Sequence, residues 1–246
     1  MSAISAMTIK AAQISQGGLH ILYDAALIDA PVSDFFDIDH WRGSEDLVRE
    51  AQGRAAACIF RYHEYEFVLR HYRRGGLMAK LSNDRYQWSG LEKTRAWREW
   101  HLLAEMFAQG LPVPRPVAAR VQRHGLFYSA DLVTLCLPDV KPLADVLMQS
   151  ALEEAQWQLI GRTIKQFHDA CVYHADLNAR NILLNKEGRV FVIDFDKGEK
   201  QPVDSAWQQA NIERLQRSLN KFKTNEAQFY FDEQAWQALL NGYQDR

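Results

Sequence analysis

The sequence has few cysteines, no long apolar run and almost no net charge. Its three cysteines are far apart in a chain of 246 residues, and each lies in an apolar stretch (AAACIF, TLCLP, DACVY). This context favours free, buried thiols in a reducing compartment over a disulfide set or a metal knuckle. No apolar run approaches the roughly 18 residues of a transmembrane helix, and the first residues do not resemble a signal peptide. We therefore expect a soluble or peripheral protein.

The charge balance excludes one class of partner. Lys and Arg number 29 against 31 Asp and Glu, which gives a net charge of −2. A chain without a global basic field is not expected to bind nucleic acid, although local basic patches remain possible. The sequence also lacks internal repeats, low-complexity tracts and any linker long enough to separate independent modules.

The first half of the chain reads as a small lobe of strands with one main helix. Residues 1 to about 40 are mixed and predict short strands or an arm. The runs LVREAQ, AAACIFRY and FVLRHY predict an antiparallel meander of three strands. Residues 91–110 have apolar positions at helical spacing, and residues 117–122 and 126–137 predict a second hairpin. We place the end of this N-terminal lobe at residue 137.

The second half, residues 138–246, is mostly helical. Helices are predicted over residues 152–172, 205–222 and 232–243, and two short strands, NILL and VFVID, lie around the turn NKEG. The predicted fold class is therefore α+β, with an antiparallel N-terminal lobe, a helical C-terminal lobe and a cleft.

The stretch YHADLNARNILL carries the strongest chemical signal. His174, Asp176, Leu177 and Asn181 match the H-x-D-L-x-x-x-N loop of phosphoryl-transfer enzymes, with Ala175 in place of the usual Arg. In that loop the Asp accepts the proton of the substrate hydroxyl and the Asn holds a metal ion. Asp176 is therefore the predicted catalytic base. The same residue types also occur in turns, where they cap helices and fix the backbone.

The hairpin that follows returns a second carboxylate. Asp194 comes thirteen residues after Asn181, at the end of VFVID, in a DFD sequence where protein kinases carry D-F-G. An Asn amide oxygen and an Asp carboxylate are hard ligands suited to Mg²⁺. Asn181 and Asp194 are the predicted metal ligands, for an ion that would bridge the phosphates of ATP.

The first half offers candidates for the remaining parts of a nucleotide site. Gly53 lies in a turn where a glycine-rich loop would cover the phosphates, and Arg70 occupies the place of the Lys in V-A-I-K. Glu99, in the middle of the predicted helix, is the best carboxylate to pair with Arg70; Glu92 and Glu105 are the alternatives. Guanidinium binds phosphate bidentately but is not equivalent to an ammonium group, and Arg70 could instead be a solvent-facing strand residue.

These residues together resemble a known family. FVLRHYRRGG, RAWREWHLL followed by GLPVPRP, and YHADLNARNILL with VIDFDKG look, in order and spacing, like the lipopolysaccharide core kinases of Gram-negative bacteria, which have the protein-kinase-like fold. The resemblance covers roughly residues 40 to 200.

The resemblance implies a two-lobed kinase that uses ATP and Mg²⁺ to phosphorylate a hydroxyl of 3-deoxy-D-manno-octulosonic acid (Kdo) on a lipid A precursor. It also implies a peripheral enzyme at the cytoplasmic face of the bacterial inner membrane. The basic, aromatic run RHYRRGG offers a receptor for such an anionic glycolipid, with Arg73, Arg74 and Lys80 as candidate contacts. A solvated charged loop would look the same.

Other readings differ in the acceptor or in activity. A protein kinase would need an A-P-E element and a large helical subdomain, but only fifty residues follow Asp196, so no protein substrate is expected. A small-molecule kinase of the aminoglycoside or choline type shares the catalytic loop. A pseudokinase would bind nucleotide without catalysis, but Asp176, Asn181 and Asp194 are all retained.

Overall fold

The structure is a computed structural model that describes residues 8–51, 57–73 and 85–245. The chain forms two compact units. The first comprises Met1–Ala108 and Pro114–Cys136, and the second comprises Gln109–Val113 and Leu137–Arg246. Strands and helices both contribute, as expected for a mixed chain with an antiparallel sheet.

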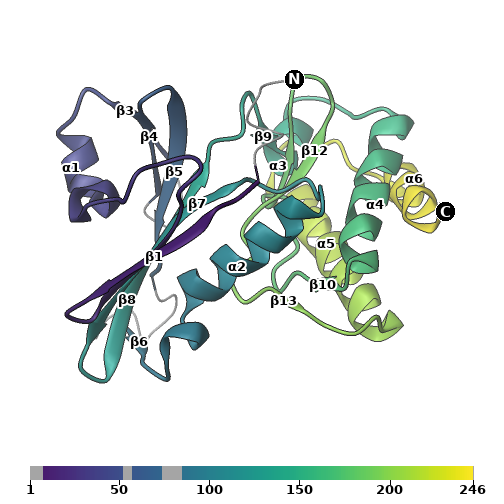
Figure 1. The fold of residues 1–246 in the computed structure, drawn as a ribbon. Coiled ribbons are helices and arrows are strands. Elements are labelled where there is room, and N and C mark those ends of the chain that lie inside the picture. Colours follow the sequence, from purple (N-terminus) through teal and green to yellow (C-terminus); the bar gives the residue numbers. More distant parts are fainter. Residues whose placement is uncertain (1–7, 52–56, 74–84, 246) are drawn as a thin grey trace. The chain divides into compact units, whose positions relative to one another are not determined.

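The first unit is built on an antiparallel sheet, in which the described residues contribute eight strands (Figure 1). Seven of them follow the order β1-β2-β7-β8-β5-β4-β3, and β6 pairs with β8. The predicted meander forms β3 to β5, and the predicted hairpin forms β7 and β8. The strands are β1 (Ala11–Gln16), β2 (Leu19–Asp24), β3 (Leu47–Ala51), β4 (Ala57–Tyr62), β5 (Tyr65–His71), β6 (Tyr86–Gln87), β7 (Pro116–His124) and β8 (Phe127–Leu135).

The hairpin of β1 and β2 shows how the turn residues fix the register. Gln16 pairs with Leu19, so Gly17 and Gly18 form a two-residue turn, with φ angles of 58° and 83°. Positive φ at both central positions is typical of a type I′ turn, whose twist matches that of the paired strands. The mixed N-terminal segment therefore adds two strands to the sheet.

The helix α2 (Arg95–Ala108) packs against β7 and β8. The sequence predicts a helix from Leu91, but Leu91–Lys93 form the separate short helix η4 and Thr94 has extended backbone. The buried side chains of α2 recur at helical spacing, and they include Trp97, Trp100 and Met106. Amphipathic spacing therefore gives α2 an inner face, and Glu99 lies on it.

The side chains of β5 alternate between an apolar core on one face of the sheet and α2 on the other. Phe67 and Leu69 belong to an apolar core, which also receives Phe35 and Phe36 from η2 (Ser33–Phe36) and Trp41 from α1 (Ile38–Arg42). Successive side chains of a strand point to opposite faces. Arg70 therefore lies on the other face of β5, where it meets α2.

The second unit contains four helices and five short strands among its described residues. The strands β9, β11 and β12 form one sheet, and β10 pairs with β13. The helices predicted over residues 152–172, 205–222 and 232–243 correspond to α4, α5 and α6. The elements are β9 (Lys141–Pro142), α3 (Leu143–Leu147), α4 (Glu154–Asp169), β10 (Val172–Tyr173), β11 (Ile182–Leu184), β12 (Val190–Val192), β13 (Glu199–Lys200), α5 (Ser205–Asn225) and α6 (Glu233–Gln244).

The helices α4 and α6 touch backbone to backbone at two glycines. A Cβ atom on Gly161 would overlap the carbonyl oxygen of Leu239 and lie 2.7 Å from the backbone nitrogen of Tyr243. A Cβ atom on Gly242 would overlap the carbonyl oxygen of Gln158. Because backbone atoms cannot rotate away as side chains can, no side chain larger than hydrogen fits at this crossing.

Replacing Gly161 with alanine is therefore expected to lower the free energy of unfolding, at or above the upper end of the ~1–3 kcal/mol typical of an overpacked core. Urea denaturation of the wild type and the variant measures the difference. Gly43→Ala is the control, because a Cβ atom there meets its nearest neighbour at 3.6 Å. Equal midpoints for wild type and Gly161→Ala would contradict the described crossing.

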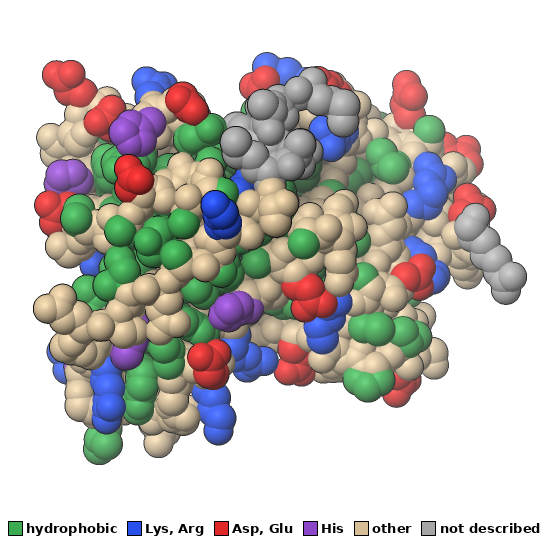
Figure 2. Space-filling view, viewed as in Figure 1, with side chains coloured by type: hydrophobic (Ala, Val, Ile, Leu, Met, Phe, Trp, Pro, Cys, Tyr) green, Lys and Arg blue, Asp and Glu red, His purple; other side chains and the backbone are tan. Residues whose placement is uncertain are grey.

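On the face seen in Figure 2, acidic and basic side chains are interspersed and do not form separate fields. This distribution agrees with the net charge of −2. Among the described residues, no helix combines the length and apolar character needed to cross a membrane.

Candidate active site

His174 organises the loop that follows β10. Its Nδ1 accepts a hydrogen bond of 3.1 Å from the backbone N–H of Asp176. A backbone N–H can only donate, so the ring proton is on Nε2, which donates to the carbonyl of Ile193 at 3.0 Å. Burial lowers the pKa of His174, which keeps the ring neutral and this pair of contacts intact. His174 thereby joins the loop to the end of β12.

Asn181 closes the same loop from its other end. Its side chain is buried, and Nδ2 donates to the backbone carbonyl of Asp176 at 3.0 Å. This contact fixes the amide so that Oδ1 is the atom that can coordinate a cation. The spacing between Asp176 and Asn181 in the sequence motif thus corresponds to one loop, which this hydrogen bond closes.

Asp194 is brought to Asn181 by the hairpin of β11 and β12. The backbone N–H of Ile193 donates to the backbone carbonyl of Asn181 at 2.9 Å, so Asp194 follows directly on a residue paired with Asn181. Asp194 has a φ of 65°. Non-glycine residues with positive φ are uncommon, and they concentrate at functional sites.

The two predicted metal ligands therefore come from neighbouring segments. The described part of the chain contains no cluster of three or more His, Cys, Asp or Glu able to hold a metal ion. Mg²⁺ in phosphoryl-transfer sites takes one or two carboxylates and completes its shell with water and substrate phosphates. An Asn oxygen and an Asp carboxylate fit an ion of that kind.

Asp176 presents its carboxylate at the surface of the second unit, where 60% of the side chain is exposed. One oxygen, Oδ1, accepts a hydrogen bond of 3.1 Å from Arg214 on α5, and Oδ2 accepts one of 3.1 Å from Asn178. A carboxylate exposed in this way can meet an incoming hydroxyl group, as a general base must.

In the first unit, Arg70 and Glu99 form the pair that the sequence predicted in preference to Glu92 or Glu105. The guanidinium of Arg70 lies 2.5 Å from Oε1 of Glu99, and their side chains are 19% and 3% exposed. Tyr72 donates its hydroxyl to Oε2 of Glu99 at 2.5 Å and accepts from Arg70 at 3.2 Å. Glu99 thus holds both a cation and a phenol in place.

Of the four other predicted site residues, the structure describes one. Gly53, Arg74 and Lys80 lie outside the described residues. Arg73 is described, and it is exposed. Arg70 and Glu99 belong to the first unit, whereas Asp176, Asn181 and Asp194 belong to the second.

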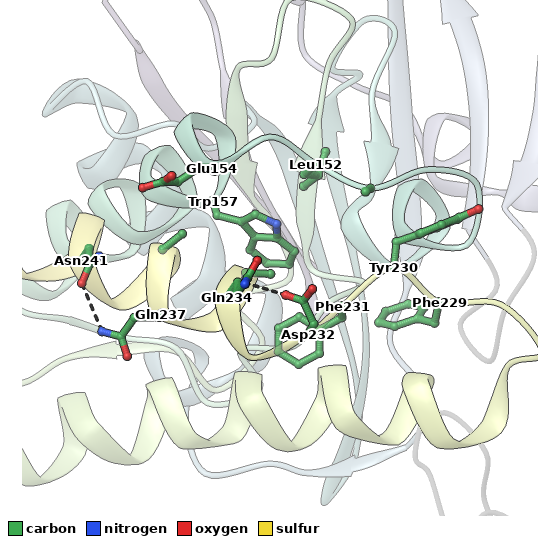
Figure 3. Close-up of a pocket in the computed structure, with 13 residues that line it drawn as sticks. Leu152, Glu154, Trp157, Phe229, Tyr230, Phe231, Asp232, Gln234, Gln237 and Asn241 are labelled. Carbon is green, nitrogen blue, oxygen red and sulfur yellow. Dashed lines mark hydrogen bonds between the residues drawn. The ribbon is translucent and has the colours of Figure 1, made fainter.

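A cavity of about 650 Å³ lies elsewhere in the second unit, among residues of α4, α6 and the segment before α6 (Figure 3). Trp157, Phe231 and Asp232 are among the residues that line it, and Leu152 and Tyr230 also contribute. The predicted site residues of the second unit, Asp176, Asn181 and Asp194, do not border this cavity. The cavity is therefore separate from the loop of residues 174–181, which carries the predicted catalytic base.

Several site residues were missed at the level of sequence. Arg214 contacts Asp176, Asn211 accepts from His174, Ser218 accepts from Ala179, and Tyr72 contacts Glu99. A signal for the residues of α5 was present in the sequence. Asn211, Arg214 and Ser218 are spaced three and four residues apart, which places them on one face of the helix beside its apolar positions.

One loop and one hairpin bring the predicted base, Asp176, and the predicted metal ligands, Asn181 and Asp194, into neighbouring segments, as expected for an enzyme that transfers phosphoryl groups. The comparison with known families agrees: the model of the lipopolysaccharide kinase (Kdo/WaaP) family matches residues 5–243. The chain belongs to this family.

Similar proteins are 3-deoxy-D-manno-octulosonic acid kinases. That of Photobacterium profundum is 41% identical over 224 residues, which cover 91% of this chain and 94% of the relative. That of Vibrio cholerae is 41% identical over 82% of this chain and 85% of the relative. That of Haemophilus influenzae is 36% identical over 94% of this chain and 98% of the relative.

Proposed function

We propose that this protein transfers the γ-phosphoryl group of ATP to a hydroxyl of Kdo on a lipid A precursor, in lipopolysaccharide core synthesis. The observation that carries the proposal is the loop from His174 to Asn181, with Asp194 beside it. The identity of the sugar rests on the names of the relatives, which act on 3-deoxy-D-manno-octulosonic acid.

In the proposed reaction, Asp176 accepts the proton of the acceptor hydroxyl as the oxygen attacks the γ-phosphorus, and the bond between that phosphorus and the ADP oxygen breaks. Asn181 and Asp194 would hold Mg²⁺, which offsets the charge of the phosphates. Arg70, oriented by Glu99, binds a phosphate oxygen with a fixed guanidinium fork. Positioning and charge are the main contributions of a protein to phosphoryl transfer.

We propose the two-lobed protein-kinase-like fold for the same reasons. A sheet unit that carries Arg70 and Glu99, and a helical unit that carries the catalytic loop, match the division of labour in kinases. The family membership and the order of motifs support this assignment.

The proposed location is the cytoplasmic face of the inner membrane, with peripheral attachment. A lipid-linked acceptor requires the enzyme to work at a membrane surface, where ATP must also be available. Fractionation of cells tests this location. If most of the enzyme stayed in the membrane after salt and carbonate extraction, peripheral attachment would be wrong.

The activity is tested by incubating the purified protein with γ-labelled ATP and three sets of acceptors. These are a Kdo-lipid A precursor, a panel of aminoglycosides with choline, and a peptide library. We expect label only in the Kdo-containing acceptor. Label in a peptide or an aminoglycoside, and none in the precursor, would refute the proposed acceptor, and no label in any would favour a pseudokinase.

A further inference from the structure

The helix α5 is attached to the catalytic loop at two points. Asn211 accepts a hydrogen bond of 3.3 Å from the backbone N–H of His174, and Ser218 accepts one of 3.2 Å from the backbone N–H of Ala179. Asn211 is 1% exposed. Arg214 lies between these two points on the same face of the helix. The backbone of α5 therefore holds Arg214 at a fixed position beside the loop.

Arg214 reaches the oxygen on which the proposed reaction depends. Its Nη1 atom lies 3.1 Å from Oδ1 of Asp176, and the side chains are 46% and 60% exposed. An ion pair this exposed contributes little to stability, because water and salt screen the attraction and two long side chains lose their freedom. Stability therefore does not account for an arginine at this place.

Arg180, the cation within the loop, has other partners. Arg180 forms an ion pair of 3.3 Å with Asp145, and its guanidinium lies 5.2 Å from the centre of the Phe222 ring. In the ion pairs that the structure describes, Asp176 is contacted by Arg214. Among the described ion pairs, Arg214 is thus the cation that contacts the proposed base.

The acceptor in the proposed function is an acid, and this matches the chemistry of Arg214. Guanidinium binds a carboxylate through two parallel hydrogen bonds, which fixes orientation as well as distance. A sugar carboxylate held by Arg214 would be fixed relative to Asp176, since α5, which carries Arg214, is hydrogen-bonded to the loop that carries Asp176. The hydroxyl groups of the same sugar would then be aligned with the base.

We propose that Arg214 binds the carboxylate of the acceptor sugar and orients its reacting hydroxyl toward Asp176, an inference that rests on the proposed function. In the free enzyme Arg214 pairs with Asp176. When the acceptor enters, its carboxylate replaces Asp176 as the partner of Arg214, and Oδ1 of Asp176 becomes able to accept the hydroxyl proton. A sugar without a carboxylate leaves Arg214 on Asp176 and is a poor acceptor.

The test compares two acceptors: the Kdo-lipid A precursor and the same molecule with its Kdo carboxylate converted to the neutral carboxamide. Steady-state kinetics are measured for the wild type, Arg214→Gln, Arg214→Lys and a control, Arg162→Gln. Arg162 is an arginine of similar exposure, 41%, that pairs with Asp245 on another part of the second unit. Thermal unfolding of each variant is recorded alongside.

The wild type should lose ~10–100-fold in kcat/KM on the carboxamide, the range expected for a hydrogen bond between charged groups. Arg214→Gln should lose a similar factor on the acid, mainly through a higher KM for the acceptor. On the carboxamide, the kcat/KM of Arg214→Gln should be little lower than that of the same variant on the acid. Its KM for ATP should equal that of the wild type. Arg214→Lys should recover part of the loss, and Arg162→Gln should behave as the wild type.

Two results would overturn the inference while leaving the proposed function intact. One is an Arg214→Gln variant that still prefers the acid over the carboxamide as strongly as the wild type does. The other is an Arg214→Gln variant whose kcat falls by the same factor on both acceptors while its KM for the acceptor stays at the wild-type value. That result would mean that Arg214 acts only through Asp176. If the wild type phosphorylates neither acceptor, the proposed function itself fails and the inference falls with it.

Discussion

Replacing Asp176 with alanine is expected to lower kcat by ~10²–10⁴, the usual contribution of a general base, with little change in the affinity for ATP. The carboxylate is proposed to take the acceptor proton and has no proposed contact with the nucleotide. The substitution is expected to leave the loop folded. The contacts of Asp176 with His174 and Asn181 are made by its backbone N–H and carbonyl, which alanine keeps.

Asp139→Ala is the matched control for this variant. Asp139 is also an exposed carboxylate of the second unit, 66% exposed, and it pairs with Lys186. Asp194→Asn should give a different signature, because it removes charge from the proposed metal site and so weakens nucleotide binding together with the rate. A folded Asp176→Ala enzyme with near-full turnover would remove Asp176 from its assigned role.

The geometry of the candidate catalytic loop and of the hairpin that follows it could be predicted because it is local. His174, Asp176 and Asn181 are joined by hydrogen bonds within one loop, and the pairing of β11 with β12 returns Asp194 to Asn181. Few conformations of such a short stretch satisfy its turn residues and its apolar strands together.

The contact of α5 with this loop could not be predicted in the same way. Arg214 lies 38 residues after Asp176 in the sequence. Its side chain meets Asp176 only because the apolar face of the helix, with Leu215 and Leu219 buried, sets the rotation of α5 against the second unit. Periodicity identifies which face of a helix is buried, but not which segment the neighbouring polar positions will meet.

The same distinction applies in the first unit. Tyr72 lies in the run RHYRR, which has the character of a charged, exposed segment, yet its side chain is buried against Glu99. Alternation along the strand puts Tyr72 on the same side of the sheet as Arg70. That side is buried only because α2 packs against it. Likewise, the short segments with Phe35 and Trp41 show no clear period, because each spans little more than one helical turn.

The pair of Arg70 and Glu99 should act as a unit in catalysis. Arg70→Ala and Glu99→Ala are each expected to lower kcat/KM for ATP by ~10²–10³, as happens when one preorganised donor to a charged transition state is removed. Without Glu99 the guanidinium has no fixed direction, so removing both should cost little more than removing either. Arg70→Lys, which keeps the charge but not the planar fork, should be partly active.

A double-mutant cycle in kcat/KM measures this coupling. Removing one member of a buried pair typically destabilises by ~3–5 kcal/mol, so the free energy of unfolding of each variant must be measured and assays kept well below its transition. Arg61→Ala is the control, since Arg61 forms an ion pair with Glu66 in the same sheet, where the side chains are 57% and 42% exposed. Strict additivity, with wild-type affinity for ATP in both single variants, would take Arg70 out of the nucleotide site. Arg70 would then belong with the basic run that follows β5, where the sequence predicted contacts with the acceptor.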